Sequence, residues 1–341
     1  MLRSQLIRVS LPAHRSLTGA GRLKRGFGSS DLARMLPPVP ILRPTLWAIA
    51  ATATIYVGCA TYEVYRETRI AKQNGQWKES VNSYDDLVKV RGYWGLLIGR
   101  PTPRPSSVSK WFPTEQVSSM MKGHSSAENL TICISAFNVG LVGAGYLAPN
   151  SIAPYFHHVP ALGLNYTLLT SAFGHHGIFH VMVNTFMLLQ FTPEVAKSRV
   201  FRGNGSHFAA FYLSAGILSS LGNHIGTVLP TRKYRFNRLA PAAGASGVCM
   251  ALLGAWATIN PDQKVGILFV PGSYAARDMV GFIALVDLVG FFIGIPYLHF
   301  AHAAHLAGLA FGHAYVRYDA RNKIWIPTCR SVFTCMKRLK M

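Results

Sequence analysis

Apolar runs of about 20 residues recur along this chain of 341 residues, and they limit its possible folds more than any other feature. One run, residues 44–63, stands apart, and six more follow each other closely after residue 128. These six cover residues 129–148, 174–192, 206–229, 244–260, 278–297 and 299–317. An α-helix needs about 20 apolar residues to cross the hydrocarbon core of a bilayer. The pattern therefore predicts an all-α polytopic membrane protein, with a six-helix core preceded by one additional helix.

Composition supports a membrane protein. Half of the residues are hydrophobic and only 14% are charged, whereas soluble domains carry about 25% charged residues. The chain has 34 Lys and Arg against 13 Asp and Glu, a formal net charge of +21. In a soluble protein this excess would suggest nucleic-acid binding, but no recognition motif accompanies it. The cations gather near the termini and in the loops, which indicates targeting and contact with anionic membrane lipids.

The segments around the six-helix core have distinct compositions. Residues 1–28 are predicted to be a mitochondrial transit peptide, because they are rich in arginine and serine and lack acidic residues. The alternative is a basic, disordered tail of a bacterial or plasma-membrane protein. The other predicted segments are a basic stretch at 29–43, the additional helix at 44–63, a polar linker at 64–128 with an interfacial segment at 93–100, the core at 129–318 and a basic C-terminal tail at 319–341.

Polar side chains inside apolar runs are costly, so each one is a candidate functional residue. Ser246 stands in the sequence Gly244-Ala245-Ser246-Gly247, which opens the run 244–260. Glycines allow a sharp turn, and the first turn of a helix offers free N–H groups and the positive end of the helix dipole. Ser246 is therefore a candidate nucleophile. The alternative is a packing serine that bonds to its own backbone or to a neighbouring helix.

A serine nucleophile needs a base, and the last run offers His305. Small residues recur every fourth position beside His305, and a similar face occurs on the Ser246 run; such faces let two helices approach closely. The two faces are formed by Ala304, Gly308 and Gly312 and by Gly247, Ala251 and Ala255. We expect them to bring the Ser246 hydroxyl within hydrogen-bond distance of His305. The alternative is a structural histidine that bonds to a carbonyl group.

Three further polar residues lie in the predicted spans. His180 and Asn184 are four residues apart and share one helix face. They are predicted to donate hydrogen bonds to an oxyanion, together with the Ser246 N–H, although an internal hydrogen-bonded pair is an equal alternative. Asp287 has no partner that the sequence identifies. It is predicted to be structural, paired with a histidine or with a loop arginine.

Together these motifs resemble the rhomboid family of intramembrane serine proteases. The family's Gly-x-Ser-Gly motif is matched by Gly244–Gly247, its Ala-His-x-x-Gly-x-x-x-Gly motif by Ala304–Gly312, and its His-x-x-x-Asn motif by His180–Asn184. All three occur in the family's order and in the expected helices, within residues 129–318. Many rhomboids also carry a Trp-Arg pair in the first core loop, and residues 149–173 lack it, which leaves the contacts of that loop in doubt.

The resemblance implies a six-helix rhomboid catalytic core with one additional N-terminal helix, and a reaction that needs no metal or cofactor. It implies that His305 takes the proton of Ser246, which then attacks a peptide bond of a single-pass transmembrane substrate. His180, Asn184 and the Ser246 N–H would hold the oxyanion, and Gly247, Ala304, Gly308 and Gly312 would pack the two helices.

More narrowly, the transit peptide, the additional helix and the sequence FYLSAGILSS are similar to the mitochondrial presenilin-associated rhomboid-like proteases. This similarity implies a multi-pass enzyme of the mitochondrial inner membrane, with substrates tied to mitochondrial dynamics, mitophagy and apoptosis.

Two other functions stay open. A catalytically inactive rhomboid-like protein would bind membrane proteins without cutting them. A membrane metalloprotein or transporter would use a set of core histidines, but the sequence lacks an HExxH motif and offers few core carboxylates. That set is His175, His176, His180, His302 and His305.

The orientation in the membrane also stays open. The additional helix places the Ser246 end of the core on the side of the chain's N-terminus, together with the basic segment 231–238. The basic C-terminal tail falls on the other side. Both sides therefore carry a basic segment, and the positive-inside rule does not decide the orientation.

Overall fold

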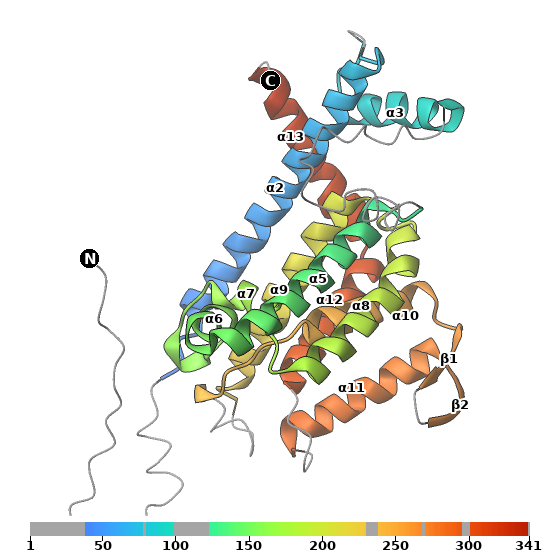
Figure 1. Ribbon diagram of the computed structural model, residues 1–341. Helices are drawn as coiled ribbons and strands as arrows, with labels where there is room; N and C mark the ends of the chain where they lie inside the picture. Colours follow the sequence, from blue (N-terminus) through green and yellow to red (C-terminus); the bar gives the residue numbers. More distant parts are fainter. Residues whose placement is uncertain are drawn as a thin grey trace, which may run out of the picture. The chain divides into compact units, whose positions relative to one another are not determined.

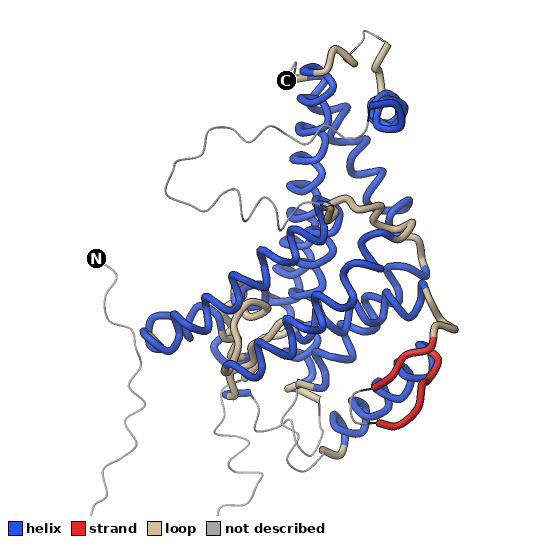
Figure 2. Tube along the Cα trace, turned by 45° about the vertical axis from the view of Figure 1, so that its right-hand side comes forward, coloured by secondary structure: helices blue, strands red, loops and turns tan. Residues whose placement is uncertain are grey.

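Helices form nearly all of the regular structure in the computed structural model, which describes residues 38–77, 80–98, 123–229, 238–267, 270–294 and 301–339. The helices are α2 Leu42–Gln73, α3 Tyr84–Ile98, α5 Ser126–Leu147, α6 Pro149–Phe156, α7 Thr167–Thr170, α8 Ile178–Lys197, α9 Gly205–Gly226, α10 Ser246–Ile259, α11 Ala276–Phe292, α12 His302–Arg317 and α13 Ile326–Arg338 (Figures 1 and 2). The predicted helical fold class is thus confirmed. The predicted transit peptide, residues 1–28, lies outside the described residues.

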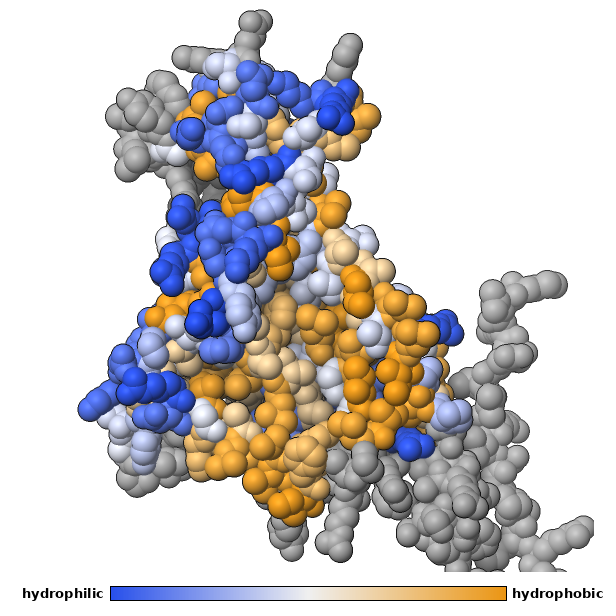
Figure 3. Space-filling view, turned by 180° about the vertical axis from the view of Figure 1, so that it is seen from behind, coloured by the Kyte–Doolittle hydropathy of each residue, from blue (hydrophilic) through white to orange (hydrophobic). Residues whose placement is uncertain are grey.

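Each predicted apolar run corresponds to one helix. The six core runs became α5, α8, α9, α10, α11 and α12, and the isolated run 44–63 lies within α2. By length and composition, α2 and α5 are long and apolar enough to cross a bilayer, and only 17% and 22% of their most apolar windows are buried. Large apolar side chains also point outward elsewhere, such as Phe179 of α8 (81% exposed) and Phe282 of α11 (60% exposed). Figure 3 shows a broad hydrophobic surface over the lower body of the molecule, as expected for contact with lipid.

Polar residues set where two of the helices begin. Ser125 and Glu128 form a reciprocal capping box at the start of α5: the Glu128 carboxylate accepts the Ser125 N–H at 2.7 Å, and the Ser125 hydroxyl accepts the Glu128 N–H at 3.3 Å. Asn204 caps α9 by accepting the His207 N–H at 2.8 Å. Local sequence therefore starts these helices at positions close to those predicted from the apolar runs.

The centre of the core is α10, which packs against α12 through small residues. Gly308 of α12 lies directly over the carbonyl group of Gly247, and Gly312 lies over the carbonyl group of Ala251. A Cβ atom at either glycine of α12 would overlap these backbone atoms. The absence of side chains thus lets the two backbones touch, and this close approach determines which side chains meet at the ends of the helices.

The additional helix α2 is attached to the core by buried polar groups. The Glu63 carboxylate accepts hydrogen bonds from Asn204 Nδ2 at 2.7 Å and from Ser206 Oγ at 2.8 Å. Tyr56 donates its hydroxyl to the Tyr315 hydroxyl of α12 at 2.8 Å. Glu63 is 3% exposed. Because Glu63 is paired inside the protein, the charge that seemed to end the span at residue 63 does not end the helix, which continues to Gln73.

The start of α2 lies at the same end of the core as Ser246. His224, near the end of α9, donates its Nε2 hydrogen to the carbonyl oxygen of Pro40 at 2.6 Å. The preceding residue, Asn223, lines a cavity together with Ser246. The structure therefore agrees with the placement expected from one additional helix.

Two helical segments occupy regions expected to be a linker and a tail. Within the linker, α3 spans Tyr84–Ile98, and within the tail the π-helical turn η3, Arg321–Trp325, leads into α13. The apolar side of α13, with Cys329 and Phe333 buried, packs against α2 (Figure 1). An Arg330–Asp85 ion pair joins α13 to α3 at 2.9 Å.

A short hairpin connects α10 to α11. Its strands, β1 Lys264–Ile267 and β2 Val270–Ala275, are antiparallel, with Lys264 opposite Ala275. The apolar runs gave no sign of this hairpin, because its strands are too short to produce a regular alternation.

Candidate active site

Ser246 and His305 meet at the end of the α10–α12 contact. The Ser246 Oγ and His305 Nε2 atoms are 3.0 Å apart. Ser246 is the first residue of α10, and His305 lies in the first turn of α12, where its side chain is 10% exposed. The geometry is that of a hydroxyl bonded to an imidazole base. It follows from the glycine contacts, because a wider separation of α10 and α12 would pull the two side chains apart.

Asp287 of α11 contacts the other side of the same imidazole. Its Oδ1 atom lies 3.2 Å from His305 Nδ1 and 2.6 Å from His302 Nδ1. The ring of His302 lies directly against Gly290, one turn after Asp287, so the missing side chain leaves room for this ring between the helices. Asp287 therefore has the histidine partner that was one of its two predicted options. Its contact with His305 in particular was not predicted.

These contacts determine the hydrogen positions on His305. An ionised carboxylate only accepts hydrogen bonds, so the Nδ1 atoms of His302 and His305 must both donate to Asp287. A neutral His305 ring then has no hydrogen on Nε2, which is free to accept the hydroxyl hydrogen of Ser246. Three elements, α10, α11 and α12, thus contribute one continuous row of hydroxyl, imidazole and carboxylate groups.

His180 of α8 lies beside the turn that leads to Ser246. A Cβ atom placed on Gly244 would stand 2.9 Å from His180 Nε2 and 3.7 Å from Ser246 Oγ. The space between the imidazole and the hydroxyl is therefore open only because residue 244 is a glycine. The φ angle of Gly244 is +143°, in the region that other residues rarely adopt.

Asn184, one turn further along α8, makes different contacts. Its Nδ2 atom donates to the His180 carbonyl at 3.0 Å, and its Oδ1 atom accepts from Cys249 Sγ of α10 at 3.5 Å. The structure brings the His180 ring toward Ser246 and uses Asn184 to join α8 to α10. One hydrogen of the Asn184 amide group remains for a further acceptor.

His175 is a site residue whose role was not predicted. Its Nδ1 atom donates to the Phe173 carbonyl at 3.1 Å, so Nε2 is the acceptor for the Ala245 N–H at 3.3 Å. This bond fixes the peptide that precedes Ser246. The signal in the sequence is the histidine pair His175-His176 just before the helix, which also belongs to the alternative set of metal ligands.

The histidines of the alternative metal site are not gathered into a ligand group. Across the described parts of the chain, no three His, Cys, Asp or Glu side chains are arranged to hold a metal ion. Two of the five, His302 and His305, are instead directed at one carboxylate, that of Asp287.

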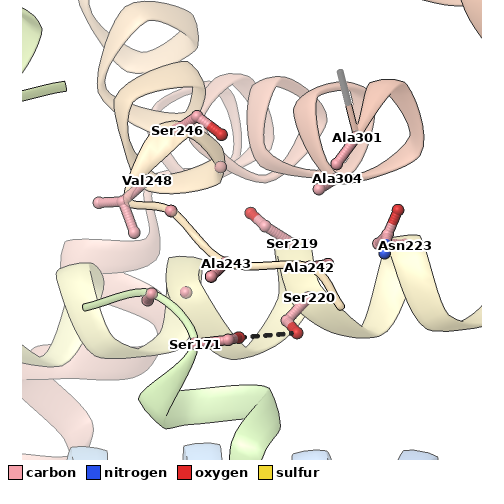
Figure 4. A pocket seen from close by; sticks show the side chains of 14 residues that line it. Ser171, Ser219, Ser220, Asn223, Ala242, Ala243, Ser246, Val248, Ala301 and Ala304 are labelled. Atoms are coloured by element: carbon pink, nitrogen blue, oxygen red, sulfur yellow. Dashed lines mark hydrogen bonds between the residues drawn. The ribbon is translucent and has the colours of Figure 1, made fainter. Parts of the chain in front are cut away.

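A small cavity adjoins the nucleophile. It has a volume of about 40 Å³, and its lining includes Ser219, Ser220 and Asn223 of α9 together with Ser246 (Figure 4). Ser171 Oγ lies 3.3 Å from Ser220 Oγ at its floor. Such a volume holds a water molecule when polar groups are present. The buried Ser219 hydroxyl has no hydrogen-bond partner within the described residues, so it can bind one.

The glycine contact predicts a large effect of one methyl group. In Gly308→Ala the new Cβ would overlap the Gly247 carbonyl group, and we expect a loss of about 1–3 kcal/mol of stability from overpacking. The midpoint of thermal unfolding in detergent should fall, and the Ser246–His305 bond should be disturbed. Gly143→Ala, in an open part of α5, is the matched control and should be neutral or slightly stabilising. Equal midpoints for both variants would contradict the contact.

Comparison with known proteins identifies the family of the chain. The rhomboid domain model matches residues 163–322, which include all of the groups described above. Presenilin-associated rhomboid-like protein, mitochondrial, of Homo sapiens is 27% identical over 296 residues, which is 84% of this chain and 69% of the relative. Presenilin-associated rhomboid-like protein A, mitochondrial, of Danio rerio is 33% identical over 159 residues, 46% of this chain and 38% of the relative. The resemblance seen in the motifs is confirmed, and the chain carries a rhomboid domain.

Proposed function

We propose that this rhomboid is an intramembrane serine endopeptidase that uses Ser246 as nucleophile and His305 as general base and acid. The observation that carries the proposal is the 3.0 Å contact between Ser246 Oγ and His305 Nε2. A structural serine would bond to its own helix, and a structural histidine to a carbonyl group. Here each side chain bonds to the other, in a protein whose family acts on membrane proteins.

The reaction is an acyl transfer. His305 Nε2 takes the hydroxyl proton as Ser246 Oγ attacks the carbonyl carbon of a peptide bond. The C–N bond then breaks, His305 returns the proton to the leaving amine, and the acyl group stays on Ser246. A water molecule, which the small cavity can supply, gives a proton to His305 and attacks the acyl group. The free carboxylic acid leaves, and the Ser246 hydroxyl is restored.

The oxyanion of the tetrahedral intermediate needs hydrogen-bond donors. The Ser246 N–H has no acceptor within α10, because it is at the first position of the helix. We propose that it acts with the His180 ring across the open space at Gly244. Asn184 can add its remaining amide hydrogen, in addition to holding α8 against α10. These roles make Gly244 essential, since a side chain there would fill the oxyanion position.

Asp287 is proposed as a positioning residue of the same site. Its charge favours the imidazolium that forms when His305 takes the proton, and its contact with Nδ1 keeps the ring in the correct orientation. The sequence suggested a dyad without a carboxylate. The geometry supports a row of three groups, in which Asp287 acts through His305.

Substrates are proposed to be single-pass transmembrane proteins that reach Ser246 from the lipid. A transmembrane helix hides its carbonyl groups in internal hydrogen bonds, so the substrate must unwind near the cleaved bond. We propose that α2 and the six core helices all cross the membrane.

The location proposed is the mitochondrial inner membrane, because the similar proteins named above are mitochondrial and residues 1–28 have the composition of a transit peptide. Roles in mitochondrial dynamics, mitophagy and apoptosis rest on the family resemblance alone.

One experiment separates the proposed protease from its two alternatives. The purified full chain, in phosphatidylcholine vesicles, is incubated in separate samples with a single-span reporter protein and with a serine-directed phosphonylating reagent. We expect cleavage near one end of the reporter helix, a covalent adduct on Ser246, and no effect of a metal chelator. Reporter that is retained but never cut would support the inactive client-binding protein. Cleavage that stops with chelator would support the metalloprotein.

A further inference from the structure

A second cavity lies at the end of the core opposite the proposed active site. It has a volume of about 260 Å³, several times the roughly 30 Å³ that one water molecule occupies. Its walls are formed where α8 ends, where α9 begins and where α12 passes into η3. Arg317 of α12 lies in this wall, twelve residues after His305, which corresponds to about 18 Å along the helix. The cavity therefore has no part in the chemistry at Ser246.

Positive charge dominates the lining of this cavity. Four arginines line it, and Asp319 is the one acidic residue among the lining side chains. The four are Arg199, Arg202, Arg317 and Arg321. Asp319 accepts a hydrogen bond from Asn322 at 2.8 Å, and within the described residues none of the four arginines forms an ion pair with a carboxylate. We call this group of four the arginine pocket.

The arginines repel one another, and the charge of Asp319 offsets this repulsion at Arg321 only in part. Arg321 is partly buried, and its Nη1 atom donates to the Val200 carbonyl at 3.3 Å. Burial lowers the pKa of Arg321, and the neighbouring charge of Arg202 lowers this pKa further. Like charges held together in this way raise the free energy of the protein, and a bound anion would remove that cost.

Backbone conformation adds an independent observation. In the described part of the chain, the non-glycine residues with positive φ are Arg202, at 49°, and Asp319, at 54°, and both line this cavity. Such a conformation is unfavourable for a residue with a side chain and persists where its surroundings require it. The strain turns the chain at both sides of the cavity, so the arginine pocket is formed by unfavourable local conformations as well as by unfavourable charges.

We propose that the arginine pocket binds a phosphate oxyanion, and that the phosphate belongs to the headgroup of an anionic phospholipid. Guanidinium groups match phosphate oxygens in pairs of parallel hydrogen bonds, which makes arginine the preferred residue for such groups. The pocket lies where the core helices end, at the depth of the lipid headgroups if these helices span the bilayer. Basic pockets between helix ends at this depth are suited to lipid phosphates. A soluble phosphate compound carries the same chemistry and is the second possible source.

The test measures binding and does not depend on proteolysis, so we use the full chain with Ser246→Ala throughout. The protein is purified in detergent with phosphatidylcholine alone or with added phosphatidylglycerol, and retained lipids are counted by native mass spectrometry. A third sample contains inorganic phosphate and phosphatidylcholine. The midpoint of thermal unfolding is measured for each sample.

The pocket variant is Arg202→Gln with Arg317→Gln, both at exposed positions. The control, Lys323→Gln with Arg338→Gln, removes the same charge from exposed positions outside the pocket.

We expect the parent and the control to retain phosphatidylglycerol and to unfold at a higher temperature with it. The pocket variant should bind this lipid at least about tenfold more weakly. If inorganic phosphate gives the same protection, lost in the same variant, the phosphate site stands and its source is a soluble compound. Equal lipid retention and equal midpoints in the pocket variant and the control would overturn the proposal.

Discussion

Replacing Ser246 with alanine is expected to reduce reporter cleavage by at least about 10⁴-fold. The hydroxyl is the attacking group in the proposed reaction, and its Oγ atom lies 3.0 Å from His305 Nε2. Serine proteases that lose the nucleophile retain only the small acceleration provided by the oxyanion site and by substrate binding. The measurement is the initial rate of cleavage in vesicles at a substrate concentration that saturates the parent protein.

A matched control is Ser214→Ala. Ser214 is a fully buried serine of α9, and its hydroxyl has no hydrogen-bond partner in the described residues. The same oxygen atom is lost there, and we expect the rate to change by less than about threefold. If Ser246→Ala and Ser214→Ala cleave the reporter equally fast, Ser246 is not the nucleophile.

His305→Ala should lose about as much activity as Ser246→Ala, and the double variant should be no slower than either single variant. Groups that act as one unit in catalysis show this strong non-additivity. Losses that multiply in the double variant would mean that Ser246 and His305 act independently. The 3.0 Å contact would then be structural.

The core helices of this protein could be predicted well because each of them coincides with a long apolar run in the sequence. The core runs and the observed helices differ by a few residues at their ends, as for the run 244–260 and α10, Ser246–Ile259. The proximity of Ser246 and His305 could also be expected from their small-residue faces, since only glycine and alanine let α10 and α12 approach so closely.

The contact between Asp287 and His305 could not be predicted, because it depends on where α11 packs. An apolar run does not specify which of its faces meets a neighbouring helix. One signal was present: His302 and His305 are three residues apart and share a face of α12. Two imidazoles on one buried face require a common partner, and Asp287 is the carboxylate that the preceding run provides.

The C-terminal helix α13 was missed for the opposite reason. Its cations indicated a basic tail, yet Cys329 and Phe333 recur at helical spacing and are buried. Its partner is the part of α2 that follows residue 63. This part was not predicted, because the charge of Glu63 indicated that the apolar run ends there. Each of these helices is apolar on one face only, so neither is recognised until the other is known to cover it.

Asp287→Asn is the second change with a large expected effect. Two Nδ1–H groups now point at a single carboxylate oxygen, and an amide oxygen in its place could still accept both but would carry no negative charge to balance the imidazolium. In the other orientation of the amide, the asparagine NH₂ group would face the imidazoles and require an Nδ1 atom to accept. If this ring is His305, its hydrogen moves to Nε2, and the base for Ser246 is lost.

We expect the turnover number of Asp287→Asn to fall by about 10²–10⁴-fold, because the loss of correct orientation and of the balancing charge has effects of this size in comparable sites. The Michaelis constant should change little, since Asp287 touches His302 and His305 and no substrate group. Asp278→Asn, an exposed carboxylate on the same helix, is the control and should retain the parent rate.

A buried carboxylate also contributes to stability, so the unfolding midpoint must be measured beside the rate. Removing one partner of a buried charged pair costs about 3–5 kcal/mol. A folded variant with a normal Michaelis constant and slow turnover identifies Asp287 as a positioning residue that acts through His305. A folded variant with the parent turnover would show that His305 and Ser246 suffice as a dyad, and that the carboxylate only joins α11 to α12.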